Sequence, residues 1–226
     1  GCITTTPKPG WAWCDMVGTF RRALGVSVGF DTDVNASVLG EVRFGQGRGL
    51  STVLYLTVGT GIGLGVYLNG ALHHGIVHPE AGHVLLSLHP EEHWTCRCPY
   101  HPNCLEGLAC GPAIEERWGA RAEALAQRRK VWEMEAYYIA QALVDYICIL
   151  APEKIILGGG VMRQRQLFPL IRSEVRRMMG GYLAAEELND LDTYIVPESL
   201  NGDQGILGSL CLGAAEWARE HGGREA

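Results

Sequence analysis

The sequence predicts an α/β fold, because short apolar runs that suit β-strands alternate along the chain with longer segments of helical periodicity. The run 53–58 is almost continuously apolar and contains β-branched residues, as expected of a strand buried on both faces. The segment 131–150 places apolar residues at helical spacing and ends before Pro152. The predicted strands are 26–30, 53–58, 62–68, 84–88, 154–157 and 193–196, and the predicted helices are 34–44, 131–150, 161–179 and 205–220.

The composition is that of a folded protein. Of the 226 residues, 47% are hydrophobic and 19% are charged, which allows a sizeable core and excludes a disordered chain. The formal net charge of −6 gives no electrostatic reason to expect nucleic acid or anionic lipid as a partner. The uncharged stretch 50–79 is broken by several glycines, so it predicts strands and turns rather than a membrane span. We therefore expect no nucleic-acid partner and no membrane.

The eight cysteines do not have the spacing of a disulfide framework. Only Cys96, Cys98 and Cys104 cluster, and His101 lies between them. Scattered thiols with one Cys/His group predict a reducing compartment, the cytoplasm, and a metal site. Cys98, His101 and Cys104 follow one another at intervals of three residues and can surround one zinc ion, which takes four nitrogen or sulfur ligands. Either Cys96 or a distant histidine such as His83 could supply the fourth ligand. The alternative is a group of unrelated buried thiols.

Two acidic residues follow the predicted strand 26–30 and open the next predicted helix. Asp31, Asp33 and Asn35 are suitably placed to face a cleft at a strand's carboxyl end. An EF-hand is excluded because its sixth position would be Ala36 and its twelfth Val42. The alternative is that an aspartate caps the helix, because carboxylates accept bonds from the free amides there.

Two glycine-rich turns suit phosphate binding, because bare backbone lets amide groups approach an anion closely. The first comprises Gly59, Thr60 and Gly61, and the second Gly158 to Gly160. The first turn is neither a Walker A loop nor a dinucleotide fingerprint. A glycine-rich hairpin and a tightly packed strand-to-helix turn are the alternatives. The segment 78–83 contains Glu80 and His83, which could bind hydroxyl groups or belong to an ordinary surface loop.

Taken in order, these segments resemble the ROK family of sugar kinases and repressors, and most closely its zinc-containing bacterial fructokinases. The resemblance runs from about the first residue to Gly213. Its most specific part is the metal segment, where Cys-Pro-Tyr-His is followed three residues later by Cys104. The matching segments are 31–35, 39–41, 58–63, 78–83, 98–107, 111–113 and 157–162.

The resemblance implies an actin-like (ribonuclease H-like) sugar kinase fold with an incomplete first lobe. Residues 1–45 would be the remnant of the N-terminal lobe, and 46–226 the C-terminal ATPase-like lobe with an inserted zinc loop at 83–104. The chain opens on Gly1 rather than methionine, so we expect an N-terminal truncation. The family's opening hairpin, which contacts phosphate, would then be absent, and the 226-residue chain would turn over ATP poorly.

The resemblance also implies roles for individual residues. Asp33 would be the catalytic base, and Glu80, His83 and Asn35 would bind the sugar. Structural zinc would be held by His83, Cys98, His101 and Cys104, and Mg²⁺ would accompany ATP. The residues expected to bind ATP are Gly59, Thr60, Gly61, Pro112, Gly158, Gly159, Gly160, Val161 and Met162.

The implied activity is ATP-dependent phosphorylation of fructose to fructose 6-phosphate by a homodimer. Glucose, mannose or an N-acetyl hexosamine are alternative substrates. Two other classes of function are possible for such a sequence: a sugar-responsive transcriptional repressor and an inactive fragment that binds sugar. An N-terminal helix-turn-helix would indicate the repressor, and the net negative charge disfavours it.

Overall fold

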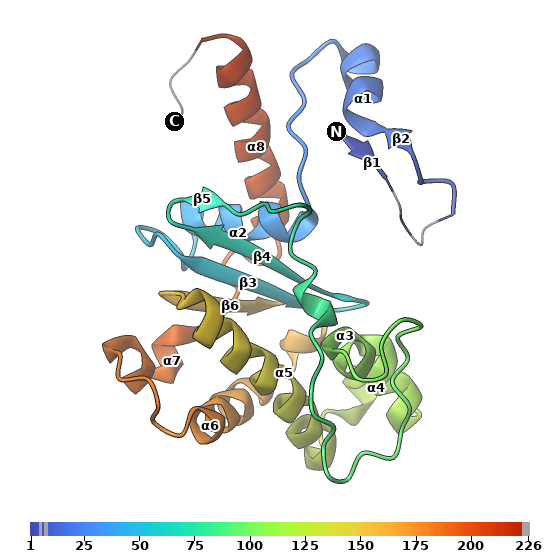
Figure 1. Cartoon of the computed structure of the whole chain (residues 1–226), viewed down its shortest axis with the longest axis vertical. Helices are drawn as coiled ribbons and strands as arrows, with labels where there is room; N and C mark the ends of the chain where they lie inside the picture. Colours follow the sequence, from blue (N-terminus) through green and yellow to red (C-terminus); the bar gives the residue numbers. More distant parts are fainter. Residues whose placement is uncertain (5, 7–8, 223–226) are drawn as a thin grey trace.

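A computed structural model describes residues 1–4, 6 and 9–222, and its centre is a mixed five-stranded sheet (Figure 1). The strand order is β5-β4-β3-β6-β7, with β3, β4 and β5 antiparallel in turn and β3, β6 and β7 parallel. Helices α2 and α8 cover one face of the sheet, and α5 and α6 cover the other. The sheet strands are β3 (Val53–Val58), β4 (Ile62–Leu68), β5 (Ala71–Leu72), β6 (Lys154–Gly158) and β7 (Ile195–Pro197).

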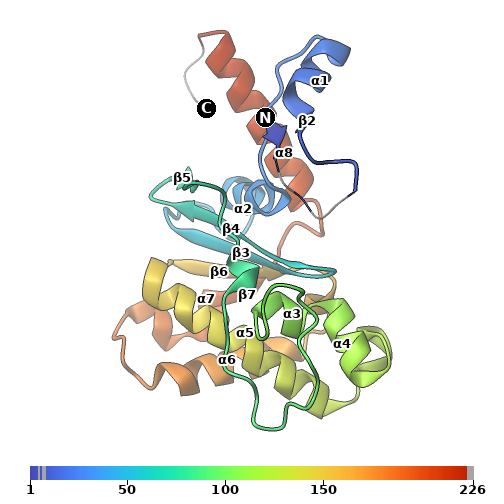
Figure 2. The same ribbon diagram turned by 45° about the vertical axis from the view of Figure 1, so that its right-hand side comes forward.

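Most of the remaining elements lie on the two sides of this sheet, whereas α1, β1 and β2 stand apart from it near α8 (Figure 2). The helices are α1 (Met16–Leu24), α2 (Asp33–Phe44), α3 (Leu105–Ala109), α4 (Gly111–Trp118), α5 (Arg129–Leu150), α6 (Leu167–Met179), α7 (Leu191–Tyr194) and α8 (Gln204–Glu220). Strands β1 (Cys2–Ile3) and β2 (Cys14–Asp15) form a separate small pair, and short 3-10 turns occupy Ala81–His83, Ala122–Leu125, Val161–Arg163 and Glu186–Asn189.

Strand β3 lies at the centre of the core and is buried on both faces. Its side chains alternate, as the two-residue repeat of a strand requires. Leu54, Leu56 and Val58 join the hydrophobic cluster shared with α5 and α6. Val53 and Tyr55 join the second cluster, which includes residues of α2. This double burial confirms the expectation of a two-sided strand and explains its unbroken apolar sequence.

The turn between β4 and β5 has the Asn-Gly sequence that predicts a tight hairpin. Asn69 and Gly70 connect the two strands and have φ angles of 52° and 85°. Two consecutive positive φ values are typical of a type I′ turn, whose twist matches that of antiparallel strands. Asparagine and glycine are the residues that tolerate this backbone best, so the local sequence determines the turn.

Helices α2 and α8 cross at very short distance. A Cβ atom added at Gly208 would lie 1.7 Å from the carbonyl oxygen of Ala36, and one at Gly40 would lie 2.2 Å from that of Gln204. The two helix backbones therefore touch where neither helix carries a side chain. This contact holds α2, whose first residue is Asp33, against α8.

Three local expectations are wrong. Residues 26–30 form no strand, and Gly29 instead packs against the backbone of Leu212 on α8. Segment 84–88 makes only one isolated bridge, between Leu85 and Cys104. The helix expected over 161–179 begins at Leu167. Proline lacks an N–H and is tolerated only in the first turn of a helix, so Pro169 fixes this later start.

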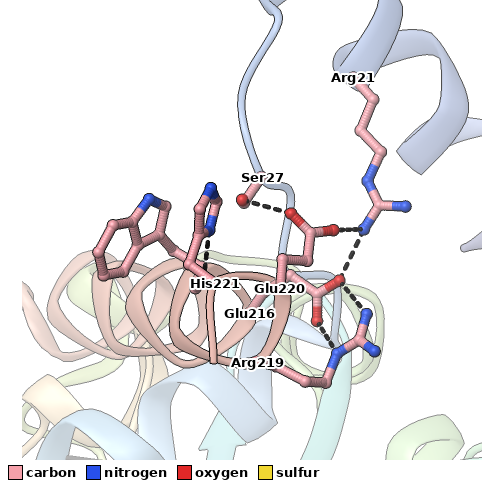
Figure 3. Close-up of polar contacts among 7 residues, drawn as sticks. Arg21, Ser27, Glu216, Arg219, Glu220 and His221 are labelled. Atoms are coloured by element: carbon pink, nitrogen blue, oxygen red, sulfur yellow. Dashed lines mark hydrogen bonds and ion pairs between the residues drawn. The ribbon is translucent and has the colours of Figure 1, made fainter. Parts of the chain in front are cut away.

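The N-terminal unit, which comprises β1, β2 and α1, is attached to α8 by charged side chains (Figure 3). Arg21 on α1 lies 2.6 Å from Glu216 and 2.6 Å from Glu220. The Ser27 hydroxyl donates to Glu220, and Arg219 pairs with Glu216. Helix α1 buries none of its residues in the chain, so these exposed ion pairs are its principal attachment to α8. Across residues 1–4, 6 and 9–222, no helix is both long and apolar enough to cross a membrane.

We predict that Gly208→Ala destabilises the protein by about 1–3 kcal/mol, because the new methyl group forces the α2 and α8 backbones apart. Gly213→Ala on the same helix is the matched control, since nothing lies within 4 Å of a Cβ atom there. The control should leave stability unchanged or raise it by up to about 1 kcal/mol. Urea unfolding of both variants measures the difference, and equal stabilities would contradict the close-contact explanation.

Candidate active site

A hollow of about 380 Å³ opens where the two glycine turns meet. Strands β3 and β6 are parallel neighbours, and Thr57 pairs with Gly158. The turns that follow these strands must therefore lie side by side at the same edge of the sheet, where α/β proteins commonly bind ligands. The lining residues are Thr57, Gly59, Thr60, Gly111, Pro112, Glu115, Arg121, Ala122, Glu123, Gly159, Gly160 and Val161.

Backbone contacts hold the turns in place. The Gly59 amide donates to the Gly61 carbonyl at 2.9 Å, and the Gly59 carbonyl accepts from the Gly111 amide at 2.7 Å. Gly159 has a φ of +92°, and a Cβ atom there would lie 2.5 Å from the Val58 carbonyl oxygen. Only glycine fits that position, which leaves one wall of the hollow formed by bare backbone.

The structure brings six of the nine expected ATP-binding residues to this hollow: Gly59, Thr60, Pro112, Gly159, Gly160 and Val161. The other three lie behind its surface. A Cβ atom at Gly61 would approach Glu106 to 2.8 Å, and one at Gly158 would collide with the hydroxyl of Tyr55. Met162 is 2% exposed and belongs to the core.

Sequence reasoning missed three charged residues of the hollow, Glu115, Arg121 and Glu123. They come from α4 and the turn that follows it. No motif marks this segment, because its position depends on how α4 packs beside the Gly59 turn. The Gly111 amide that bonds to Gly59 begins α4, so this contact brings the three side chains to the hollow.

Asp33 is the first residue of α2, and its side chain is exposed. The helix cap is Thr32, whose hydroxyl oxygen accepts from the Asn35 amide at 3.2 Å, so the expectation of an aspartate cap is wrong. Asp33 lines a second, shallow hollow of about 480 Å³ together with the beginning of α8. Next to it, Val34 packs against Gly63 and Gly65 of β4. Asp33 thus lies beside the strand that leaves the Gly59–Gly61 turn, and its exposed carboxylate accepts from the Val34 amide through Oδ1.

Asn35 is buried and connects the segment before α2 to strand β4. Its side chain is 1% exposed, its Nδ2 donates to Asp31 Oδ1 at 2.8 Å, and its Oδ1 accepts from the Val66 amide at 3.3 Å. A side chain buried in this way cannot touch a sugar in the present conformation. In this structure Asn35 anchors Asp31 to β4, and its contact with a sugar stays a prediction.

The expected sugar-facing segment follows β5. Glu80 is exposed, and its Oε1 lies 2.9 Å from Nε2 of His78. His83 ends the 3-10 turn, with Nδ1 3.6 Å from Cys104 Sγ and Nε2 3.8 Å from Glu106 Oε1. If Nδ1 binds a metal, the second ring nitrogen faces a carboxylate, as is usual for metal-binding histidines.

The expected metal ligands converge. One donor atom from each of His83, Cys98, His101 and Cys104 lies within 4.8 Å of every other. A tetrahedral zinc site with sulfur and nitrogen ligands has donor separations of about 3.3–3.8 Å, so shifts of about 1 Å would complete it. Cys96 lies outside this set because its thiol donates to the His101 carbonyl at 3.3 Å. Of the two candidates for the fourth ligand, the structure favours His83. Two thiolates and two imidazoles suit zinc chemically.

Cys104, one residue of this donor set, is fixed by the start of helix α3. Cys104 caps α3 and accepts from the Gly107 amide at 3.4 Å, and it is fully buried. Burial raises the pKa of its thiol to about 12, so a bound metal would have to displace the proton.

Glu106 is a further site residue that sequence reasoning left without a role. Its Oε2 accepts from the Ile62 amide at 2.8 Å, and its other oxygen faces His83. It therefore joins the start of β4 to the metal segment. Its position two residues after Cys104 was the signal that could have identified it.

A buried ion pair fastens the metal loop to the helices. Arg117 on α4 lies 3.1 Å from Glu92, and the two side chains are 5% and 2% exposed. The Arg117 guanidinium stacks 4.8 Å from the Trp94 ring centre, and the Tyr138 hydroxyl of α5 donates to Glu92 at 2.8 Å. Each charge has a partner, as buried charges require. The donor set thus joins the two ends of the loop 83–104, and this pair holds its middle.

The family model for the ROK family matches residues 1–216. This chain belongs to the ROK family. A protein of Bacillus subtilis (strain 168) is 51% identical over 213 residues, which are 94% of this chain and 71% of the relative. The fructokinase of Pediococcus pentosaceus is 43% identical over 95% of this chain and 74% of its own length.

Solved structures agree on the fold. The ROK hexokinase of Thermus thermophilus superimposes with a TM-score of 0.72 at 26% identity, over 87% of this chain and 70% of that chain. A ROK glucokinase of Streptomyces griseus, solved with glucose and AMPPNP, gives 0.71 at 23% identity, over 91% and 74%. The chain therefore has the actin-like sugar kinase fold that the resemblance implied.

We predict that Cys98→Ser lowers bound zinc from about one ion per chain to a small fraction and lowers thermal stability, because it removes one thiolate of the donor set. Cys96→Ser is the matched control, since its sulfur lies in the same loop but outside that set. Elemental analysis and thermal unfolding measure both effects. Full zinc content in Cys98→Ser, or equal loss in both variants, would contradict the assigned ligands.

Proposed function

We propose that this chain is a fructokinase that transfers the γ-phosphoryl group of ATP to the 6-hydroxyl of fructose. The observation that carries the proposal is the ranking of its relatives. Four proteins named fructokinase are 38–43% identical, and two named glucokinase are 28–30% identical. The hollow between two glycine turns and the exposed carboxylate of Asp33 at the start of α2 are the kinds of group that phosphoryl transfer requires.

On the nucleotide side, the chain's contribution is positioning. The amides of Thr60, Gly159 and Gly160 and the Thr60 hydroxyl would donate to phosphate oxygens, and Pro112 and Val161 would line the adenosine side. Bare backbone lets these donors approach the anion closely. Arg121 is a cation at the same hollow and is suited to interact with the phosphates. Mg²⁺ bound to ATP would neutralise charge as it develops on the transferred group.

On the sugar side, Asp33 would accept the proton of the attacking hydroxyl. Its carboxylate accepts from the Val34 amide at 3.0 Å and otherwise faces solvent, so an oxygen remains available for a hydroxyl. Glu80 and His83 would bind or shape the opposite wall. His83 cannot give the same nitrogen to sugar and metal, so its contribution to sugar binding would come through the Nε2 side, where Glu106 lies.

Zinc, bound by His83, Cys98, His101 and Cys104, would be structural. All four positions of a tetrahedral ion would be filled by protein, which leaves none for a substrate. Such an ion would fix the loop 83–104 and, through His83, the adjacent Glu80 segment.

A transcriptional repressor is the second candidate that the family admits, and it is less well supported. A relative named xylose repressor is 22% identical, compared with 43% for the Pediococcus pentosaceus fructokinase. A ROK family transcriptional regulator also has a TM-score of 0.72, so the fold alone does not separate the two classes.

We further propose a cytoplasmic homodimer. The described cysteines are all free thiols, which suits a reducing compartment that also supplies ATP. Large apolar side chains on α1 and α8, including Leu24, Leu210 and Trp217, are more than half exposed and could form a subunit interface. Light scattering after gel filtration tests this assembly.

The activity is tested with a coupled ADP-release assay on the full-length protein with fructose, glucose, mannose and N-acetylmannosamine. We expect kcat/KM to be highest for fructose. A higher kcat/KM for another hexose would show that fructose is not the preferred substrate. Absence of turnover with every sugar, combined with sugar-dependent binding to DNA, would favour the repressor.

We predict that Asp33→Asn lowers kcat by about 10²–10⁴-fold, the usual contribution of a positioned general base, and leaves the dissociation constant of fructose almost unchanged. Asp203→Asn, at an exposed carboxylate before α8, is the matched control and should retain normal turnover. Steady-state kinetics and calorimetry measure the two quantities. Near-normal turnover of Asp33→Asn would assign the base elsewhere.

A further inference from the structure

His74 and Asp31 form a contact that joins the two halves of the proposed sugar site. His74 lies in the segment that leaves β5 and leads to Glu80, and Asp31 lies two residues before Asp33. The Nε2 atom of His74 is 2.8 Å from Oδ2 of Asp31. The contact lies where the segment entering α2 passes the segment leaving β5 (Figure 1).

Asp31 is held rigidly. Its side chain is 6% exposed. Its Oδ1 accepts from the Thr32 amide at 2.8 Å and from Asn35 Nδ2 at 2.8 Å, and Asn35 is itself fixed to β4. Only Oδ2 remains for His74. Because the carboxylate cannot turn without losing these bonds, it determines the orientation of the imidazole ring.

The contact also determines which ring nitrogen carries the proton. An ionised carboxylate only accepts hydrogen bonds, so Nε2 must donate to Asp31. Asn35 Nδ2 lies 3.3 Å from the same nitrogen, but it is also a donor and already bonds to Asp31, so this approach is a packing contact. In the neutral imidazole, Nδ1 is then left as an acceptor.

That second nitrogen is available to a ligand. The His74 side chain is 51% exposed, and among the described residues Nδ1 has no hydrogen-bond partner. The ring is therefore oriented by a buried carboxylate and presents a free acceptor to solvent, in the segment that leads to Glu80.

We propose that His74 is a sugar-binding residue that accepts a hydrogen bond from a hexose hydroxyl through Nδ1, and that Asp31 is its positioning residue. The inference rests on the proposed sugar kinase function. A free acceptor above a carboxylate suits a neutral hydroxyl donor and disfavours the phosphate groups of the nucleotide. His74 therefore contributes to sugar affinity and selectivity, and not to ATP binding.

The test compares two substitutions that separate the ring nitrogens. His74→Gln places its terminal amide near the position of Nε2, so its NH₂ group can still donate to Asp31 while no acceptor remains at the position of Nδ1. His73→Gln is the matched control, because His73 is the exposed neighbour and its backbone amide, not its side chain, makes the local contact with Val66. Calorimetric titration of the full-length protein with fructose, without ATP, measures sugar affinity independently of turnover.

We expect the fructose dissociation constant to rise about tenfold in His74→Gln, as for the loss of one hydrogen bond to a ligand, and to remain unchanged in His73→Gln. The dissociation constant of a non-hydrolysable ATP analogue should stay within about twofold of the wild type, because the proposed contact is made to the sugar alone. Asp31→Ala should raise the dissociation constant similarly, and the double variant should add no further increase, because both changes remove one interaction.

A set of monodeoxy fructose analogues distinguishes a sugar contact from a structural one. One analogue should bind the wild type about tenfold more weakly than fructose, and His74→Gln should not discriminate against it. Unchanged fructose affinity in a folded His74→Gln variant, or equal discrimination against every analogue in both proteins, would overturn the proposal. If the wild type binds fructose but shows no turnover, the proposed function fails while the His74 contact is still measured. If the wild type binds no hexose, the proposed function and the proposed His74 contact both fail.

Discussion

The parallel pairing of β3 with β6 is the constraint on which the candidate site depends. Because Thr57 and Gly158 are register partners, the chain must turn at the same sheet edge after both strands. Each turn consists largely of glycine, and one position, Gly159, admits no other residue. The result is a wall of backbone amides that no side chain obstructs. The strand that provides the first turn is buried on both faces, so its position, and that of the turn, is fixed by the whole core.

The second half of the site depends on side chains from segments distant in sequence. The donor set of His83, Cys98, His101 and Cys104 draws the segment after β5 and the long loop before α3 to one point. Glu106 connects this point to the start of β4, and the Arg117–Glu92 pair secures the far end of the loop. In the proposed function, nucleotide and sugar would therefore depend on different supports: backbone turns at the sheet edge for the phosphates, and a loop held by metal ligands and ion pairs for the sugar.

The sequence was most informative where local chemistry determines structure. The apolar run of β3, the Asn69–Gly70 turn and the glycine turns follow from residue type alone, and the spacing of Cys98, His101 and Cys104 indicated their convergence. Sequence reasoning failed where the outcome depends on packing. The residues 26–30 look like a strand but lie against α8, and the burial of Asn35 and the approach of Arg121 to the hollow arise only from the assembled fold. The later start of α6 was the exception, since Pro169 already marked it.

The proposal that nucleotide and sugar depend on different parts of the fold is tested most directly by removing the metal and measuring the affinity for each ligand separately. The full-length protein would be treated with a chelator, and the dissociation constants of fructose and of a non-hydrolysable ATP analogue would be determined before treatment, after treatment and after adding zinc back. We expect metal removal to weaken fructose binding by at least about tenfold, to change nucleotide binding much less, and to be reversed by zinc. Unchanged fructose affinity in the metal-free protein would contradict the assignment of the sugar to the metal-supported loop.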